Sequence, residues 1–322
     1  MKRRALVPAL AAAWPRAALA QPAGKVLRLG VLVPSARYPL LEALEQELAE
    51  LGYRRGRNLA IELRSADDTA QRFDILAAEL VQLPLDAIVA VLTPSAMALQ
   101  RASVQANTQV PIVMAGIGAD PVAAGLVQSL AKPGGIVTGV AGLGAVLAGK
   151  AFEMMRDFRP SMRRAGALVN ASDPFTSALL ETIEQAARTL PVELQVAAVH
   201  SADAYAAAFA GWSAARVDAV FVQPSLVLAR AIDLAMSHRL PSFSFVGSFA
   251  RAGGLLAYSN NGRDIARRTA SFIDRIAKGA KPALMPVEQP KVFDVLINRR
   301  TATALGLTVP PSLLVRATEV IE

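Results

Sequence analysis

Residues 26–52 read VLRLGVLVPSARYPLLEALEQELAELG, and this stretch contains the unit from which we expect the fold to be built. Its first eight residues form an apolar run typical of a buried strand, which Pro34 and Ser35 end. From Leu40 to Leu51 leucines recur at the spacing of one helical face, and a glycine then ends the pattern. The stretch therefore predicts a strand, a loop and an amphipathic helix, in that order.

The same unit recurs along the chain in two series, separated by the glycine-rich stretch 134–149. In the first series the expected strands are 26–33, 59–63, 87–92 and 111–115, and the expected helices are 40–51, 70–83 and 93–107. In the second series the expected strands are 164–170, 193–199, 217–222 and 242–246, and the expected helices are 175–190, 202–215 and 225–238. Strands that alternate with helices predict parallel sheets covered on both faces. We expect an α/β protein with two doubly wound lobes.

The C-terminal tail adds elements that are too few for a third domain. They are expected strands at 254–258 and 292–297 and expected helices at 264–278 and 301–305. We expect the tail to complete the two sheets, so that several crossings of the chain form a hinge above a cleft. The expected N-terminal lobe comprises 25–142 and 249–285, and the expected C-terminal lobe comprises 143–248 and 286–322.

The composition excludes several classes of protein. The 322 residues include no cysteine, which removes disulfide frameworks, thiol nucleophiles and cysteine-ligated zinc. His200 and His238 are the only histidines, so no metal centre is expected. The net charge of +8 falls once the four basic residues of 1–20 are set aside, because 30 basic residues then stand against 26 acidic ones. We therefore expect no nucleic-acid partner.

Residues 1–20 have the features of a secretory signal peptide. Basic residues at 2–4 precede a short apolar stretch, and Ala18-Leu19-Ala20 supplies a small-x-small cleavage pattern. The Arg3-Arg4 pair leaves a twin-arginine export route open beside the general one. No later apolar run has the length of a membrane span, and no cysteine is present to carry a lipid. The mature chain is therefore expected in the periplasm, soluble and not a lipoprotein.

Candidate ligand contacts follow the expected strands, because open parallel sheets bind small ligands beyond the carboxyl ends of their strands. The candidates are Ser35, Thr93, Ser95, Gly118, Asp120, Asn170, Ser172, Gln223, Ser225 and Gly247. Hydroxyl groups at an expected helix start suit a carboxylate, and a carboxylate side chain suits an ammonium. Amide and hydroxyl groups in the second series suit a small polar ligand bound reversibly. The alternative for each polar candidate is a role as a turn or helix cap.

Aromatic residues are few, and three of them are candidates for stacking on a ligand. These are Tyr38, Phe175 and Tyr258, for which packing in the core is the alternative.

No cofactor is expected, because two glycine-rich motifs each lack an essential part. Residues 116–121 have Pro121 where a dinucleotide fingerprint has its third glycine. Residues 144–150 have the spacing of a phosphate-binding loop, but Ala151 follows where a magnesium-binding hydroxyl is needed. A hydrolase using His200 would need a serine and an acid beside it, and the chain has no Gly-x-Ser-x-Gly nucleophile elbow.

Several segments together resemble a known family. They are LGY at 51–53, GRN at 56–58, LAAELV at 76–81, TPSA at 93–96, DPV at 120–122, GLVQSLAKPGG at 125–135, VTG at 137–139, IAKGAKP at 276–282, VEQP at 287–290, IN at 297–298 and ALGLTVPPSLL at 304–314. With these segments the chain resembles the ABC transporter substrate-binding proteins that include tryptophan and tyrosine transport components, which have the type I periplasmic-binding-protein fold.

The resemblance implies a cleft that closes on a small ligand and delivers it to a membrane permease with its ATPase. It also implies that the loops at Thr93 and Asp120 face the ligand from one lobe, and the loops at Asn170 and Gln223 from the other. Residues 223–225 read Gln-Pro-Ser instead of the Thr-Asp-Asn type of loop that we associate with members grasping an amino-acid ammonium. The implied ligand is therefore an amino acid or a related carboxylate or amide, without a preference for an aromatic one.

The sequence thus favours a binding protein that works by hinge closure, touches the membrane only through the permease and catalyses no reaction. Two alternatives stay open: an exported hydrolase that uses His200, and a periplasmic receptor that presents its ligand to a membrane kinase. A transcription regulator built from similar lobes would need a helix-turn-helix at its N-terminus, where the signal-like residues 1–20 stand.

Overall fold

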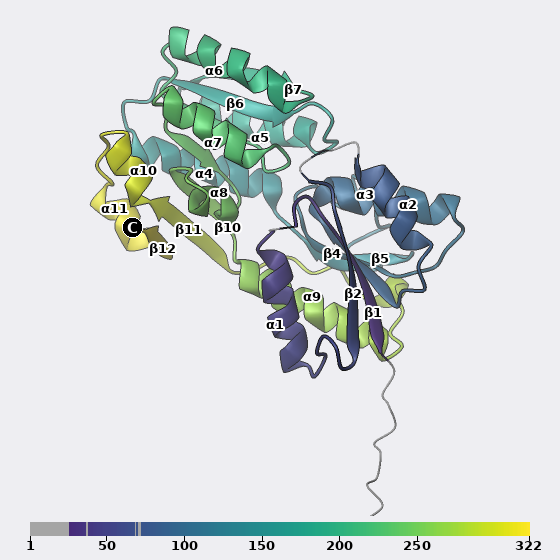
Figure 1. Ribbon diagram of the computed structural model, residues 1–322. Coiled ribbons are helices and arrows are strands. Elements are labelled where there is room, and N and C mark those ends of the chain that lie inside the picture. Colours follow the sequence, from purple (N-terminus) through teal and green to yellow (C-terminus); the bar gives the residue numbers. More distant parts are fainter. Residues whose placement is uncertain (1–25, 37, 68, 70–71) are drawn as a thin grey trace, which may run out of the picture.

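Two α/β lobes make up the part of the chain that the structure, a computed structural model, describes: residues 26–36, 38–67, 69 and 72–322 (Figure 1). The expected signal peptide, 1–20, lies outside the described residues. Most strands of each lobe direct their carboxyl ends toward the other lobe (Figure 1).

The N-terminal lobe contains a five-stranded parallel sheet in the order β2-β1-β3-β4-β5. Its strands are β1 (Leu27–Val33), β2 (Leu59–Ser65), β3 (Ala87–Val91), β4 (Ile112–Ile117) and β5 (Val137–Ala141). Helices α1 (Leu40–Glu50) and α9 (Gly262–Ala277) cover one face, and α2 (Arg72–Val81) and α3 (Leu92–Gln105) cover the other (Figure 1). The inner strands β3 and β4, and β5, are apolar and buried on both faces, whereas the edge strand β2 is partly buried and carries Glu62 and Arg64.

The C-terminal lobe contains a seven-stranded sheet in the order β12-β11-β10-β9-β8-β6-β7. Its strands are β6 (Arg164–Asn170), β7 (Glu193–Val199), β8 (Ala219–Val222), β9 (Ser242–Ser244), β10 (Leu256–Asn260), β11 (Phe293–Asn298) and β12 (Glu319–Ile321). Its helices are α4 (Gly144–Phe158), α5 (Thr176–Thr189), α6 (Tyr205–Ala214), α7 (Leu228–Ser237), α8 (Gly247–Arg251), α10 (Arg299–Ala304) and α11 (Pro311–Arg316), with a short 3-10 turn at Ala202–Ala204. A second 3-10 turn, at Pro282–Leu284, contacts β5 of the N-terminal lobe. All the pairings are parallel except that of β10 with β11.

The expected lobe boundary at residue 249 is wrong for α8 and β10. Strand β10 pairs with β9 and β11 and therefore belongs to the C-terminal sheet. The chain returns to the N-terminal lobe only at α9, whose Ala266 and Ile273 are buried in the core with α1. An apolar pattern indicates that a strand is buried, but it does not indicate which sheet the strand joins. The sequence alone therefore could not predict this boundary.

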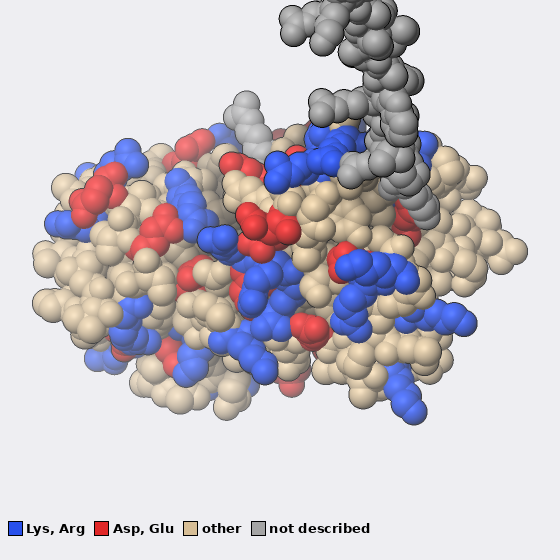
Figure 2. All heavy atoms as spheres, turned by 90° about the horizontal axis from the view of Figure 1, so that it is seen from below, with Lys and Arg blue, Asp and Glu red and all other residues tan. Residues whose placement is uncertain are grey.

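Charges on the surface are mixed in sign. On the face shown in Figure 2, basic and acidic side chains are interspersed. Many of the basic groups are paired with carboxylates, as in Arg299 with Glu322 and Arg316 with Asp157. No helix in the described part of the chain is both long enough and apolar enough to cross a bilayer.

Candidate ligand-binding cleft

Two connected spaces lie between the lobes. The narrow compartment has a volume of about 30 Å³ and is lined by residues that follow β3 and β4 in one lobe and β6 and β8 in the other. The wide compartment has a volume of about 310 Å³ and is lined by the first turns of α1 and α9 and by α8 and the end of β10. Gly116 and Asn260 line both compartments, which makes them parts of one cleft.

The sequence-predicted residues divide into those that line the cleft and those that do not. Thr93, Gly118, Gln223 and Ser225 line the narrow compartment, and Gly247 lines the wide one. Asn170, with Ser225, lines a third space of about 20 Å³ between the lobes. The residues that line none of these three spaces are Ser35, Ser95, Asp120 and Ser172.

Ser95 points into its own helix instead of the cleft. Its hydroxyl donates to the carbonyl oxygens of Val91 and Leu92, at 2.5 and 3.0 Å, and the side chain is fully buried. Thr93 is also buried, and its Oγ1 accepts a hydrogen bond from the Ala119 backbone at 3.1 Å. Helix α3 begins one residue earlier than expected, at Leu92, which has a φ of +66°. A leucine in this left-handed region is strained, and such strain is concentrated at ligand-binding turns.

Asp120 is a cap. Its Oδ1 accepts hydrogen bonds from the backbone N–H groups of Val122 and Ala123, at 2.7 and 3.2 Å, and the residue is exposed. Of the two roles that the sequence left open, pairing with an ammonium and capping the next turn, the structure has the second.

Gln223 joins the loops after β6 and β8. Its Oε1 accepts from the Asn170 backbone at 2.9 Å and from the Thr176 hydroxyl at 3.0 Å. Its Nε2 donates to Asp173 at 2.9 Å. These bonds hold the buried amide in place, so Gln223 shapes the narrow compartment that it lines.

Asp173 is a cleft residue that the sequence reasoning missed. It is buried, and burial raises the pKa of its carboxyl group, while hydrogen bonds from Ser225, Phe175 and Gln223 lower it without cancelling the effect. Its position shortly after Asn170, at the end of a strand, indicates a cleft residue. An Asp before a Pro, however, is also typical of an ordinary turn.

The loop of Asn170 also brings Ser172 next to His200. The Asn170 side chain accepts from the Ser172 backbone at 2.9 Å and lies 3.4 Å from Ser225. The Ser172 hydroxyl lies 3.3 Å from Nδ1 of His200, and both residues are exposed. Within the described ranges no carboxylate hydrogen-bonds to the His200 ring, so the serine and histidine are not completed to a triad.

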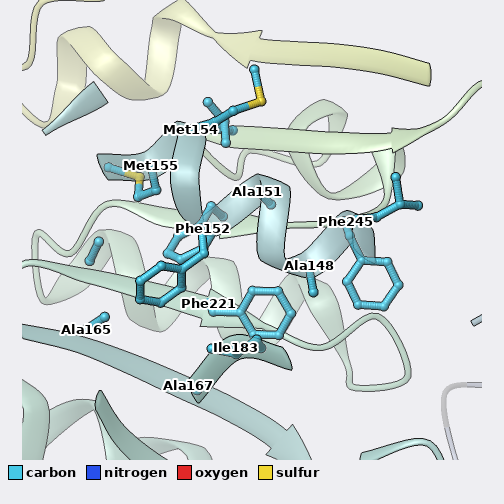
Figure 3. Close-up of a cluster of buried hydrophobic side chains, with 14 of the residues drawn as sticks. Ala148, Ala151, Phe152, Met154, Met155, Ala165, Ala167, Ile183, Phe221 and Phe245 are labelled. Carbon is cyan, nitrogen blue, oxygen red and sulfur yellow. The ribbon is translucent and has the colours of Figure 1, made fainter. Parts of the chain in front are cut away.

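Aromatic rings close one side of the narrow compartment. Phe175 packs edge-on against Phe245, with ring centroids 6.2 Å apart, and Phe245 stacks on Phe221 at 6.1 Å. Figure 3 shows that Phe245 and Phe221 belong to the core beneath α4. Tyr38 lines the wide compartment, where burial raises its pKa to about 12. Tyr258, the third stacking candidate, instead stacks on Phe293 at 5.9 Å.

The wide compartment also contains polar residues that were not predicted from the sequence. They are Ser248, Arg251, Ser259, Asn260, Asn261, Arg263 and Asp294. Hydrogen-bonding groups of both kinds, beside apolar side chains such as Leu40 and Ile265, are typical of a site for a small polar molecule. No group of three or more potential metal-ligating side chains occurs among the residues described.

Comparison with known proteins assigns this chain to a family. The profile of the family described as "ABC transporter substrate binding protein" matches residues 31–321. The chain is similar to the tyrosine-binding protein of Clostridioides difficile strain R20291, at 22% identity over 276 residues, which are 84% of this chain and 76% of that protein.

Solved structures agree with this result. A conserved domain protein from Vibrio cholerae has a TM-score of 0.82 and 25% identity, and an ABC domain from Streptococcus pneumonia in complex with L-Trp has a TM-score of 0.79 and 27% identity. Each comparison covers 92% of this chain and 100% of the other. A leucine-binding protein from Thermotoga maritima, at 12% identity and a TM-score of 0.57, shows the fold alone, over 79% of this chain and 83% of its own. The two-lobed fold expected from the sequence is confirmed, and the chain belongs to the ABC transporter substrate-binding protein family.

Proposed function

We propose that this protein captures a small amino acid, or a related carboxylate or amide, outside the cytoplasm and delivers it to the permease of an ABC importer. The observation that carries the proposal is the wide compartment. It lies between the lobes, and its volume of about 310 Å³ is at the lower end of the range for small-molecule sites. The names of two similar proteins, which refer to tyrosine and L-Trp, support an amino acid as the class of ligand.

Hinge closure is the mechanism that this arrangement supports. The wide compartment takes Tyr38 and Leu40 from one lobe and Gly247 and Ser248 from the other. A ligand in this space contacts both lobes at once only when they are close together, so it binds the closed form more tightly than the open form. The closed form then offers a permease a surface that the free protein rarely presents.

The proposals of export and of a permease partner are based on the sequence and on the family. The signal-like residues 1–20 support export, and the permease and its ATPase follow from the family. A sensory receptor would use the same cleft and differ only in its partner. The hydrolase alternative is weaker, because Ser172 and His200 are exposed and line neither compartment of the cleft.

A ligand screen tests the proposal. The mature chain from Gln21 is heated with amino acids, small carboxylates, amides, purines and sugars, and each hit is titrated by calorimetry. A ligand at a hundred times its Kd adds about 2.7 kcal/mol to the stability of the folded protein. We expect a stabilising ligand that mass spectrometry recovers unchanged. If no compound in the panel binds, or if the ligand is consumed, the proposal fails.

A further inference from the structure

The two arginines that line the wide compartment are already paired with carboxylates. Arg251 donates from Nη2 to Oε2 of Glu319 at 2.6 Å and from Nε at 3.1 Å to Oε1. Arg263 donates from Nε to Glu47 at 2.9 Å. Neither Glu319 nor Glu47 lines the compartment, so both arginine charges are balanced from outside it.

Asp294 is the acidic side chain of this compartment and has no such counter-charge. It lies on β11, opposite Ser259 of β10, and is half-buried. Both of its carboxylate oxygens accept from the single Nδ2 of Asn261, at 3.1 and 3.0 Å. In the described part of the chain no lysine or arginine forms an ion pair with it. Among the described residues that line the wide compartment, Asp294 therefore carries a negative charge that no basic side chain balances.

Asn260 adds a hydrogen-bond acceptor beside that charge. Its Oδ1 is buried and has no hydrogen-bond partner among the described residues, although the residue lines both compartments. An acceptor that loses water and gains no donor costs about 1 to 3 kcal/mol. The χ2 torsion of the amide is soft, so this oxygen can turn toward a donor that a ligand supplies.

Asp173, the acidic residue of the narrow compartment, does not compete for this role. Its oxygens accept from Gln223 at 2.9 Å and from the Phe175 backbone at 3.0 Å. Residues 223–225 supply no carboxylate either. Asp173 lines the narrow compartment, so a cationic group in the wide compartment finds its counter-charge at Asp294.

We propose that the ligand carries a primary ammonium group and that Asp294 and Asn260 bind this group at the hinge side of the wide compartment. The inference rests on the proposed function and narrows its ligand class to free amino acids and small primary amines. An ammonium has three donors and a positive charge, and a hydrogen bond from an ion to a carboxylate is about twice as strong as one between neutral groups. Carboxylic acids, amides and sugars without an amine leave the charge of Asp294 unpaired.

Pairs of ligands that differ only in the amine test the proposal on the unaltered protein. Calorimetry compares L-tryptophan with indole-3-propionic acid, L-tyrosine with 3-(4-hydroxyphenyl)propionic acid, and L-leucine with 4-methylpentanoic acid. Every other amino acid or amine that stabilises the protein in the screen is compared with its own deaminated analogue in the same way. We expect binding of the amine to be at least tenfold tighter in each pair that binds.

The variant Asp294→Asn keeps the shape of the side chain and an acceptor for Asn261 while removing the charge. We expect at least a tenfold loss of affinity for the amine, with the affinity for its deaminated analogue changed less than threefold. Asp157→Asn is the matched control, because it also removes one negative charge but from an exposed ion pair with Arg316, outside the cleft. It is expected to bind the amine as the unaltered protein does.

The outcomes separate this inference from the proposed function. If deaminated compounds, or ligands that never carried an amine, bind as tightly as amines, the inference is wrong and solute binding stands. The inference also fails if Asp294→Asn and Asp157→Asn bind the amine equally well. If Asp294→Asn does not fold, the ligand pairs on the unaltered protein still decide. If nothing in the panel binds, both the inference and the proposed function fail.

Discussion

The ring of Phe175, in the C-terminal lobe, lies against the backbone of Gly118, in the N-terminal lobe. A Cβ atom added at Gly118 would stand only 3.2 Å from Cε1 of that ring. Gly144 is packed still more tightly, because its Cβ would lie 2.9 Å from Cζ of the same ring. The contact between the lobes at the narrow compartment thus depends on two positions without side chains.

A branched side chain at Gly118 is expected to hold the lobes apart. In Gly118→Val the added methyl groups collide with the Phe175 ring when the lobes approach. We expect a larger radius of gyration with ligand present, measured by small-angle X-ray scattering, and at least a tenfold loss of affinity by calorimetry. Gly135→Val is the control, because nothing lies within 4 Å of a Cβ there and its φ is not left-handed. Equal affinity in the two variants would show that closure does not need the Phe175 contact.

Replacing Gln223 by leucine is expected to destabilise the C-terminal lobe. Gln223→Leu leaves the Asn170 N–H without its acceptor and Asp173 without one donor, while the Thr176 hydroxyl keeps the Asn170 carbonyl oxygen as its acceptor. Buried groups left unpaired cost about 1 to 3 kcal/mol each, so we expect a loss of about 2 to 4 kcal/mol in urea unfolding. Gln46→Leu, at an exposed glutamine, should change stability by less than about 0.5 kcal/mol. A similar small change in Gln223→Leu would contradict the structural role.

The fold could be predicted because its pattern is local. The leucine spacing of 40–51 and the apolar run before it each reflect one buried face, and repetition of that unit specifies a parallel sheet. The cleft could be predicted in part for the same reason: Thr93 and Gly118 follow parallel strands and line it. Where a side chain points within such a loop is settled by hydrogen bonds over a few ångströms, which is why Ser95 and Asp120 bond to their own backbone segments and do not line the cleft.

Asp294 was missed for a different reason. The rule for parallel sheets directs attention to residues after a strand, at its carboxyl end. Strand β11 runs antiparallel to β10, so Phe293, at its beginning, pairs with Asn260, at the end of β10. The amino end of β11 therefore lies at the cleft, and Asp294 reaches it from a position that the rule does not consider. Strand direction follows from pairing with β10, which the sequence does not reveal.

Arg268 is expected to contribute more to stability than its neighbour Arg267. Arg268 is one-fifth exposed and bridges Asp264 of α9, at 2.9 Å, to Glu288 of the crossing segment, at 2.6 Å. Glu288 in turn pairs with Val140 of β5. Hydrogen bonds to charged groups contribute about 1.5 to 3 kcal/mol, so we expect Arg268→Met to lose about this much in urea unfolding.

Arg267→Met is the matched control for that variant. Arg267 also bonds to Asp264, at 2.5 Å, but its side chain is 64% exposed, so solvent screens the pair and less than about 1 kcal/mol should be lost. Equal losses for the two arginines would mean that the link from α9 to the crossing segment does not stabilise the N-terminal lobe.

The stability of the protein is expected to depend on pH through Asp173. Burial raises the pKa of this carboxyl group in the folded state above its value in the unfolded chain. The folded state therefore binds the proton more tightly, and the contribution of Asp173 is greatest at low pH and is lost as the pH rises through the folded-state pKa. Urea unfolding of the unaltered protein and of Asp173→Asn, at several pH values between about 3.5 and 8, measures it. The difference in free energy of unfolding should move in favour of Asp173→Asn as the pH rises.

The contribution of Asp264 to stability is expected to depend on pH in the opposite direction. Burial alone would raise the pKa of this carboxyl group, but hydrogen bonds from Arg268 and Arg267 outweigh it, so the pKa is lowered. Its contribution is present above the unfolded pKa and is lost as the pH falls through the folded-state pKa. The difference between the unaltered protein and Asp264→Asn should therefore favour the unaltered protein at neutral pH and shrink on acidification. Two variants that respond alike to pH would contradict the assignment of burial as the dominant cause at Asp173, because only burial that outweighs hydrogen bonding reverses the sign.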